Sequence, residues 1–359
     1  MKSVCLKREA DGTYKPAYTE LPPLQPHRGH VIVEVKACGL SPVDVKVLSS
    51  LHDGAETLPV GYEVAGVVKD VGQEVTSLQV GDSVIGLLSL ASSCSGCAEE
   101  CEMSELAVVP KPESVGFIVA AGSLQPALWA YTAVHYLGNV TAGNTVLICD
   151  GATANGTVAI QLAQLWGAKV IATASNHEEA EYLEKMKPPP ACIINLSKTR
   201  SFVENCLAET GGLGADCIID QGVDLFQSGE RYSEIVLTAL SHEVGTVTGE
   251  RRRITKHDAI SALAVGGKWI TSMSQLQLDP PDSQFLSMKS ASVSFVFEHA
   301  WMLSARQHGK YMHILEDLAD KLNKDILKPM IHHTVSLLDA CSELSTLSSH
   351  LTGKVVMKI

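Results

Sequence analysis

The pattern of hydrophobic and polar positions changes its period between about residues 120 and 125 of this 359-residue chain. Before that point, short alternating runs are separated by Gly, Pro and Asp, as in 30–36, 63–71 and 82–88. This spacing is typical of strands in a small antiparallel barrel. After that point, helical periodicity alternates with short apolar runs, which predicts a parallel sheet covered on both faces by helices.

The second region and the tail contain individual elements that the pattern predicts. Helices are expected at 127–137, 178–186 and 311–323. Strands are expected at 192–196, 217–220, 268–272 and 354–359. The length also favours two domains, or one domain interrupted by another.

The clearest unit is the β-α-β pattern at 146–171. An apolar, β-rich run ends at Gly151, a small-residue turn continues to Gly156, and helical periodicity follows until Gly167. Such a turn lets backbone N–H groups approach a pyrophosphate, which the helix dipole also favours. A glycine-rich turn alone is equally consistent with a plain strand-to-helix connection.

Composition restricts the classes of partner and compartment. The formal net charge is 28 − 40 = −12, which argues against direct nucleic-acid binding. The N-terminus has no signal-peptide pattern and no run of 18 apolar residues occurs, so we expect no membrane insertion. The ten cysteines are scattered without a framework, which favours a reducing, cytoplasmic location.

Residues 61–84, GYEVAGVVKDVGQEVTSLQVGDSV, resemble a signature of the medium-chain dehydrogenase/reductase superfamily, which includes zinc alcohol dehydrogenases and quinone reductases. Further matches follow in the family's order, so that the resemblance covers essentially the whole chain. They lie at 35–47, 130–137, 151–170, 209–223, 263–270 and 352–359.

This resemblance implies an α/β fold in which a GroES-like β-barrel is interrupted by a Rossmann-fold, doubly wound parallel sheet. The implied domains are a GroES-like catalytic domain at 1–126, a Rossmann NADP-binding-type domain at 127–297, and a return to the GroES-like domain at 298–359.

The family comparison also bears on zinc. Where zinc-dependent relatives carry a Cys and a His ligand, this chain has Ser41 and Tyr62, so we expect no catalytic zinc. Cys94, Cys97 and Cys101 resemble part of the family's structural zinc lobe, but no fourth cysteine follows at a suitable spacing. We expect unligated cysteines in a strand and its preceding loop, with zinc ligation as the alternative.

In zinc-independent relatives, NADPH gives a hydride to a quinone or an activated enone, largely through positioning. The resemblance implies that Ser41, Asp44 and Tyr62 line the catalytic pocket. Their structural alternatives are a turn for Ser41, a helix cap for Asp44, and space filling for Tyr62. The cofactor-binding residues that it implies are Thr132, Gly151, Ala152, Asn155, Gly156, Thr157, Ser175 and Gly222.

The cofactor determinants depart from the family pattern. The phosphate turn is one residue shorter and keeps only its last glycine. Residues 173–175 contain no acid to hold a ribose hydroxyl, which favours NADP over NAD. Yet Glu179 stands where a lysine is expected and Leu196 where a tyrosine is expected, although Lys198 and Arg200 would compensate if their loop folds back. Weak NADPH binding, or none, is therefore expected.

An insertion at 228–258 is much longer than the family's usual connection and is interpreted as either a partly disordered surface loop or a docking element for another protein. Two functions follow. The first is a zinc-independent, NADPH-dependent quinone or enone reductase. The second, implied by a divergent branch of the family, is a weak or inactive reductase-fold subunit of a Rab-effector/mRNA-adaptor complex, recruited to early endosomes.

A homodimer through residues 290–297 is a family expectation, because a lone β-rich edge would stay unpaired.

Overall fold

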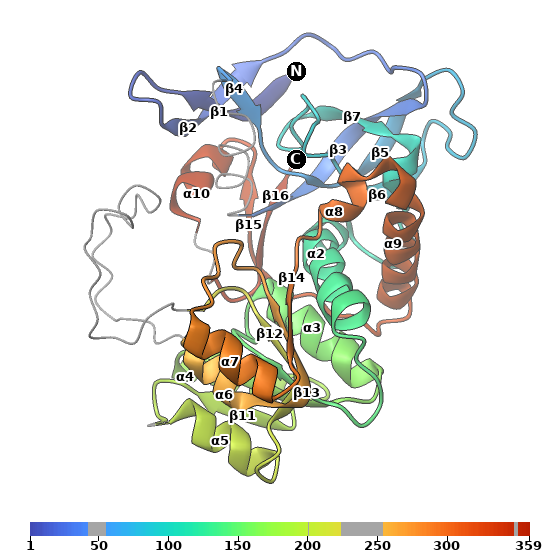
Figure 1. Cartoon of the computed structure of the whole chain (residues 1–359). Coiled ribbons are helices and arrows are strands. Elements are labelled where there is room, and N and C mark those ends of the chain that lie inside the picture. Colours follow the sequence, from blue (N-terminus) through green and yellow to red (C-terminus); the bar gives the residue numbers. More distant parts are fainter. Residues whose placement is uncertain (42–54, 200, 224–253, 348–350) are drawn as a thin grey trace. The chain divides into compact units, whose positions relative to one another are not determined.

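The computed structural model describes residues 1–41, 55–199, 201–223, 254–347 and 351–359 (Figure 1). The predictions for Asp44, for Arg200 and for most of the insertion lie outside these residues. The chain forms two compact units. The first comprises Met1–Thr132, Thr153–Ala159 and Phe297–Ile359, and the second comprises Ala133–Ala152 and Ile160–Val296.

The first unit contains two sheets. The smaller has the order β2-β1-β4, and its strands are β1 (Lys2–Arg8), β2 (Tyr14–Glu20) and β4 (Thr57–Pro59). The larger has the order β15-β16-β3-β5-β6-β8, with β7 also paired to β3. Its strands are β3 (His30–Leu40), β5 (Glu63–Val71), β6 (Ser83–Leu87), β7 (Glu100–Ser104), β8 (Val108–Pro110), β15 (Ile331–Ser336) and β16 (Lys354–Lys358).

Strand β3 shows why this sheet forms. Its β-branched side chains Val31, Val33 and Val35 are fully buried, and the strand pairs with β5, β7 and β16. Branched side chains pack well on a pleated surface, so the run is stable only with neighbours on both sides. Val64 and Met103 belong to the same core.

The first helix differs from its prediction. Helix α2 spans Phe117–Ala130 and continues as the π-helical segment Tyr131–Leu137, so it begins before residue 127. Residues 120–130 are buried on every side, and no amphipathic period therefore marks where the helix starts. Phe117–Leu137 is long and apolar enough to cross a membrane, but 83% of an 18-residue stretch of it is buried, as in a core helix.

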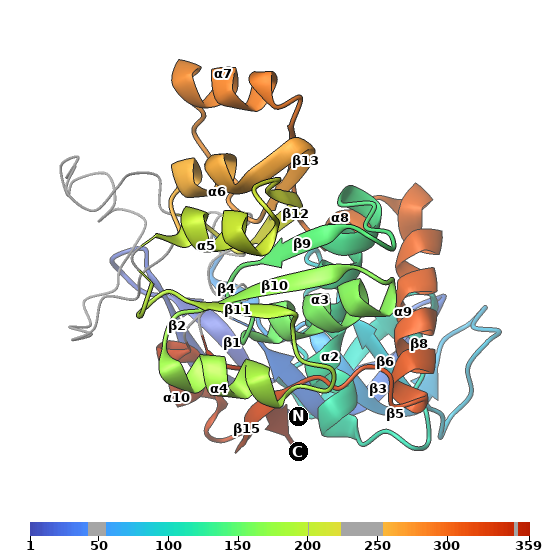
Figure 2. The same cartoon turned by 90° about the horizontal axis from the view of Figure 1, so that it is seen from below.

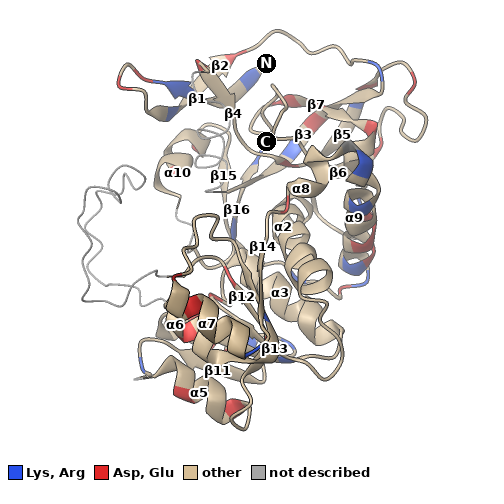
Figure 3. Cartoon of the chain, viewed as in Figure 1, with Lys and Arg blue, Asp and Glu red and all other residues tan. Residues whose placement is uncertain are grey.

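The remaining helices of the first unit are short, except for one. They are α8 (Ala300–Leu303), α9 (His308–Asn323) and α10 (Ala340–Thr346), with 3-10 turns at Glu105–Ala107 and Ala305–Gln307. Acidic and basic residues are interspersed along α9 (Figure 3), where Lys321 pairs with Asp317 and Lys324 with Asp320. This helix therefore presents no stripe of one charge sign.

The second unit is built on a parallel sheet with the strand order β11-β10-β9-β12-β13-β14. This is the order of a Rossmann fold, and every pair in it is parallel. The strands are β9 (Thr145–Ile148), β10 (Lys169–Ala174), β11 (Cys192–Asn195), β12 (Ala215–Asp220), β13 (Leu263–Thr271) and β14 (Ser292–Phe295). The predicted α/β class, with separate antiparallel and Rossmann sheets, is confirmed.

Helices lie on both faces of the parallel sheet. In Figure 2, α5 (Phe202–Glu209) and α6 (Lys256–Ala262) lie on one side, and α4 (His177–Lys185) lies on the other. Helix α7 (Pro280–Met288) packs against α6. The core between the strands and helices includes Leu147, Ile171, Ile218 and Trp269, all fully buried.

Two boundaries of the predicted elements are corrected. Helix α3 spans Ala154–Leu165, so Gly156 lies in its first turn and does not end a separate turn. The side chain of Thr153 explains the early start, because its Oγ1 accepts a hydrogen bond from the Gly156 N–H at 3.1 Å. Helix α6 begins at Lys256, so the predicted insertion at 228–258 ends in a regular element.

Candidate functional site

Ser41 and Tyr62 lie at one end of a strand pair in the first unit. Ser41 follows β3, Tyr62 precedes β5, and the antiparallel register pairs Gly39 with Glu63. Both side chains are buried. The register therefore brings together two of the three predicted catalytic residues, whereas Asp44 lies outside the described residues.

His299 is a buried histidine beside Tyr62 that the sequence analysis missed. The two rings meet edge-on, with centroids 6.2 Å apart. His299 is 3% exposed, and its Nδ1 has no hydrogen-bond partner among the described residues. Burial lowers the pKa of His299, although Glu298 and Glu63 oppose this effect. The lowered pKa keeps the imidazole neutral at neutral pH. An isolated histidine after a strand carries no sequence signal for this placement.

Glu63 is part of a buried polar network in the same unit. Its Oε1 lies 2.5 Å from the Nζ of Lys354, and both side chains are almost inaccessible. The backbone N–H of Gln125 donates to Oε2 of Glu63 at 3.1 Å. The side chain of Gln125 donates to Glu298 at 2.6 Å. Strands β5 and β16, helix α2 and the segment after β14 are thereby connected around Tyr62.

The hydroxyl of Thr132 forms hydrogen bonds within the chain. Its Oγ1 donates to the carbonyl oxygen of Leu128 at 2.7 Å and accepts from Nε1 of Trp301 at 2.8 Å. Such bonding to the preceding helical turn is common for threonine. The hydroxyl predicted to contact a cofactor is thus already engaged within the first unit.

The start of α3 carries three of the predicted cofactor residues. The N–H of Gly156 is used by the cap of Thr153, and the hydroxyl of Thr157 donates to the carbonyl oxygen of Ala154 at 2.9 Å. Thr157 is fully buried, whereas Asn155 is partly exposed. Of the side chains of Asn155 and Thr157, only that of Asn155 is therefore accessible to solvent.

The carboxyl end of β9 makes the tight turn expected of a dinucleotide domain. Asp150 has φ +52°, and its N–H donates to Oγ1 of Thr173 at 2.9 Å. The N–H of Gly151 donates to the carbonyl oxygen of Thr173 at 2.9 Å. A Cβ on Gly151 would lie 3.0 Å from the Cβ of Ala172, so a larger residue would require its neighbours to shift. Ala152 follows and is buried.

Asp220 lies at the carboxyl end of β12 and was also missed. It accepts hydrogen bonds from Nε1 of Trp269 at 2.5 Å, from Oγ1 of Thr271 at 2.8 Å and from the N–H of Gly222 at 2.7 Å. Burial raises the pKa of Asp220 to about 6, although these hydrogen bonds oppose the rise. Gly222 has φ +139°, which favours glycine. The sequence signal that could have identified Asp220 is an acidic residue at the end of an otherwise apolar strand.

Ser175 and Glu179 lie together at the carboxyl end of β10. Oε2 of Glu179 accepts the backbone N–H of Ser175 at 2.8 Å, and both residues are buried. Oε1 of Glu179 accepts from Nδ2 of Asn176 at 3.2 Å. Ser175, which was predicted to bind the cofactor, therefore donates its N–H to Glu179, the residue found where the family pattern predicts a lysine.

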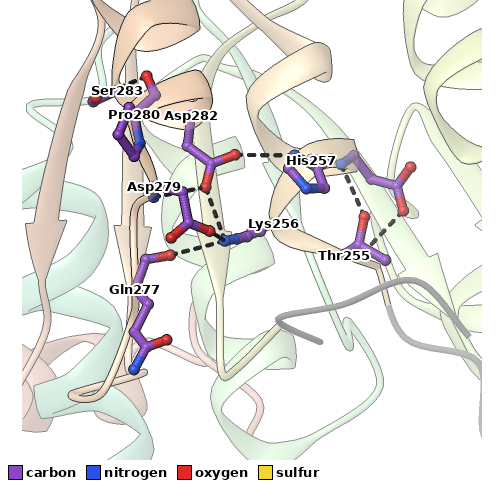
Figure 4. Close-up of polar contacts among 9 residues, drawn as sticks. Thr255, Lys256, His257, Gln277, Asp279, Pro280, Asp282 and Ser283 are labelled. Carbon is purple, nitrogen blue, oxygen red and sulfur yellow. Dashed lines mark hydrogen bonds and ion pairs between the residues drawn. The ribbon is translucent and has the colours of Figure 1, made fainter. Parts of the chain in front are cut away.

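The end of the predicted insertion is anchored. Lys256 is 1% exposed, and its Nζ lies 2.8 Å from a carboxylate oxygen of each of Asp279 and Asp282 (Figure 4). Nδ1 of His257 lies 3.0 Å from the other oxygen of Asp282. These contacts join α6 to α7, so residues 256–258 lie in a regular helix, whereas the docking role of the insertion stays a prediction.

The three clustered cysteines lie as expected, Cys101 in β7 and Cys94 and Cys97 in the loop before it. Sγ of Cys97 donates a hydrogen bond to Sγ of Cys38 at 3.9 Å, and neither of these two cysteines forms a disulfide with a described residue. Among the residues that the structure describes, no group of three or more His, Cys, Asp or Glu is arranged to hold a metal ion. Zinc independence stays a prediction.

Two family models match this chain, the alcohol dehydrogenase GroES-like domain at residues 27–139 and the zinc-binding dehydrogenase family at residues 154–227. The chain is also similar to quinone oxidoreductase-like protein 1 of Mus musculus. The two are 42% identical over 311 residues, which cover 86% of this chain and 85% of the mouse protein.

Solved structures share the fold. An alcohol dehydrogenase superfamily protein from Novosphingobium aromaticivorans gives a TM-score of 0.78 at 24% identity, covering 100% of both chains. A quinone oxidoreductase from Pseudomonas syringae gives a TM-score of 0.76 at 22% identity, also covering 100% of both. With the family models and the mouse relative, these findings confirm the predicted family: the chain belongs to the medium-chain dehydrogenase/reductase superfamily of oxidoreductases.

Proposed function

We propose that this protein is a zinc-independent reductase that transfers a hydride from a reduced nicotinamide dinucleotide to a quinone or an enone. The observation that carries the proposal is the Rossmann strand order, with the tight Gly151 turn at the carboxyl end of β9. In open parallel sheets, ligands bind beyond this end of the strands. The mouse relative's name, quinone oxidoreductase-like protein 1, supports the substrate class.

The dinucleotide, when bound, supplies the hydride. On the substrate side we assign the hydroxyl of Tyr62 to donate to a carbonyl oxygen, with Ser41 beside it at the same strand end. The neutral His299 supports the ring of Tyr62 from its edge. Asp44 remains in this assignment on the strength of the family resemblance.

On the cofactor side, we keep the residues predicted from the sequence, which fall into two groups by their hydrogen bonds and exposure. Gly151, Ala152 and Gly222 form strand-end turns, and Asn155 is partly exposed. Thr132, Gly156, Thr157 and Ser175 use hydrogen-bonding groups within the chain. This internal bonding supports the expected weakness of NADPH binding.

Tyr62→Phe tests the substrate assignment. Loss of one preorganised donor to a developing oxyanion lowers kcat about 100-fold, while dinucleotide binding stays unchanged. The measurement is NADH- and NADPH-driven reduction of a naphthoquinone, with nicotinamide fluorescence reporting binding. Tyr18→Phe is the matched control, because this exposed tyrosine of the same unit interacts with Cys341 and with the backbone carbonyl oxygens of 337 and 338, and is not assigned to the site. Equal kcat in both variants would remove Tyr62 from the mechanism, and absence of binding at millimolar dinucleotide would remove the reductase.

The second candidate is a reductase-fold subunit of an endosomal Rab-effector/mRNA-adaptor complex. The internal use of the Gly156 and Ser175 N–H groups favours it, because these donors are then not offered to a phosphate. Removal of residues 228–253 tests it, since the buried Lys256 must be kept to hold α6. Loss of early-endosome recruitment from a cytoplasmic pool would support this candidate, and unchanged recruitment would oppose it.

We also propose a homodimer through β14. Among the described residues this strand is the last in the parallel sheet, and Phe295 on it is 53% exposed. An unpaired edge with an exposed aromatic side chain favours pairing with a second chain. Light scattering that gives a monomer at micromolar concentration would contradict this assembly.

A further inference from the structure

The carboxylate of Glu179 lies at the carboxyl end of β10, where it accepts a backbone N–H. Glu179 is 3% exposed, although it belongs to the first turn of α4. Its Oε2 accepts the N–H of Ser175, and its Oε1 accepts from the side chain of Asn176. The neighbouring Glu178 in the same turn is exposed. Because Glu179 is buried while the preceding Glu178 is exposed, the side chain of Glu179 has a defined position.

This arrangement differs from an ordinary capping box. In a capping box, the glutamate at the third helical position accepts the N–H of the N-cap residue, which here is Asn176. Asn176 does cap the helix, because its Oδ1 accepts the N–H of Glu179 at 2.9 Å. The carboxylate, however, reaches one residue further back and binds the N–H of Ser175. It therefore lies against the end of the strand and not only against the helix.

A strand end followed by a helix N-terminus is a favourable place for an anion, because backbone N–H groups and the helix dipole point toward it. In NADP-binding Rossmann domains the 2′-phosphate lies after the second strand and needs a cation, whereas in NAD-binding domains an acid there accepts the ribose hydroxyl. In this chain the second strand is β10, and Glu179 uses the N–H that follows it.

We propose that Glu179 is a built-in anion that excludes a 2′-phosphate and selects dinucleotides with a free ribose 2′-hydroxyl, such as NADH. The inference rests on the proposed function for its cofactor class. The sequence favoured NADP because residues 173–175 contain no acid. The fold supplies that acid from α4, and its negative charge opposes a 2′-phosphate but not a ribose hydroxyl.

The test measures calorimetric binding of NADH and NADPH to the full chain and to two variants. We expect the wild type to bind NADH at least about tenfold more tightly than NADPH. Glu179→Gln keeps an oxygen for the Ser175 N–H and removes the charge, so it should reduce this ratio about tenfold. Glu178→Gln removes the same charge from the exposed neighbour and should leave the ratio unchanged.

Three results would overturn the inference. They are equal or tighter NADPH binding by the wild type, an unchanged ratio in Glu179→Gln, and an equal shift in Glu178→Gln. A purely structural role would appear as a lower melting temperature of Glu179→Gln with the ratio unaltered.

Failure of the proposed function is recognised separately. If the wild type binds neither dinucleotide, adenosine 2′,5′-bisphosphate decides the inference alone, because it reports the adenosine end without any activity. Binding gained in Glu179→Gln or Glu179→Lys then supports it, and no gain in either variant overturns it.

Discussion

Glu63 in the first unit and Glu179 in the second are both buried glutamates next to residues predicted for the site, but their partners differ. Glu63 pairs with Lys354, which comes from the last strand of the chain. Glu179 accepts hydrogen bonds from Ser175 and Asn176, within four positions. We expect the charge paired with the distant Lys354 to affect mainly the stability of the first unit, and the charge held by the local turn to affect which ligand that turn binds.

Lys354→Met should produce the largest effect, because it leaves Glu63 as a buried charge without its lysine. We expect a loss of about 3–5 kcal/mol in the free energy of unfolding, measured by urea denaturation. Lys324→Met breaks an exposed pair with Asp320 and should cost less than about 1 kcal/mol. If the two variants lose the same stability, the long-range pair is not the difference between the two glutamates.

A double variant sharpens the same point. Glu63→Gln combined with Lys354→Met removes both charges, so it should recover part of the stability lost in the single variant. The recovery separates the cost of an unpaired carboxylate from the cost of lost lysine packing.

Asp220→Asn should give the next largest effect, and it depends on pH. Because the folded-state pKa of about 6 lies above the ordinary value of 3.8, the carboxyl's contribution to stability is present below pH 4 and is lost as the pH rises through 6. Between pH 4 and 7, the wild type should therefore lose about 2 kcal/mol relative to Asp220→Asn. Denaturation at both pH values measures this difference.

The matched control for Asp220 is Asp216→Asn, an exposed aspartate on the same strand. If Asp216→Asn shows the same pH-dependent difference, burial at the strand end is not the cause. If Asp220→Asn shows none, the raised pKa is wrong.

Asn176→Ala should have the smallest effect on stability, about 1 kcal/mol for loss of an N-cap. It also frees Oε1 of Glu179 from its Nδ2 contact, so the ratio of NADH to NADPH binding should change. Ser201→Ala removes the equivalent cap of α5 and should lower the melting temperature similarly with no change in that ratio. A change in both variants would mean that cap loss alone alters nucleotide binding.

The sequence predicted strongly patterned elements well. The strand at 63–71 is found as β5 with the same limits, and 178–186 is found as α4 shifted by one residue. Helix α2 was predicted to start too late, because a helix buried on all sides has no amphipathic period. The start of α3 was missed because Thr153 caps it through a side-chain hydrogen bond that propensity does not reveal.

By itself, the sequence determined the family, the two kinds of sheet and the Gly151 turn, because these depend on local periodicity and ordered motifs. Only the tertiary structure decided that Lys354 pairs with Glu63, that His299 packs on Tyr62, and that Glu179 reaches Ser175. The physical reason is that burial and hydrogen-bond direction arise when strands and helices pack. In the sequence, the charge of Glu179 argued only against NADPH binding. In the fold, its position makes it the residue that we propose selects between NADH and NADPH.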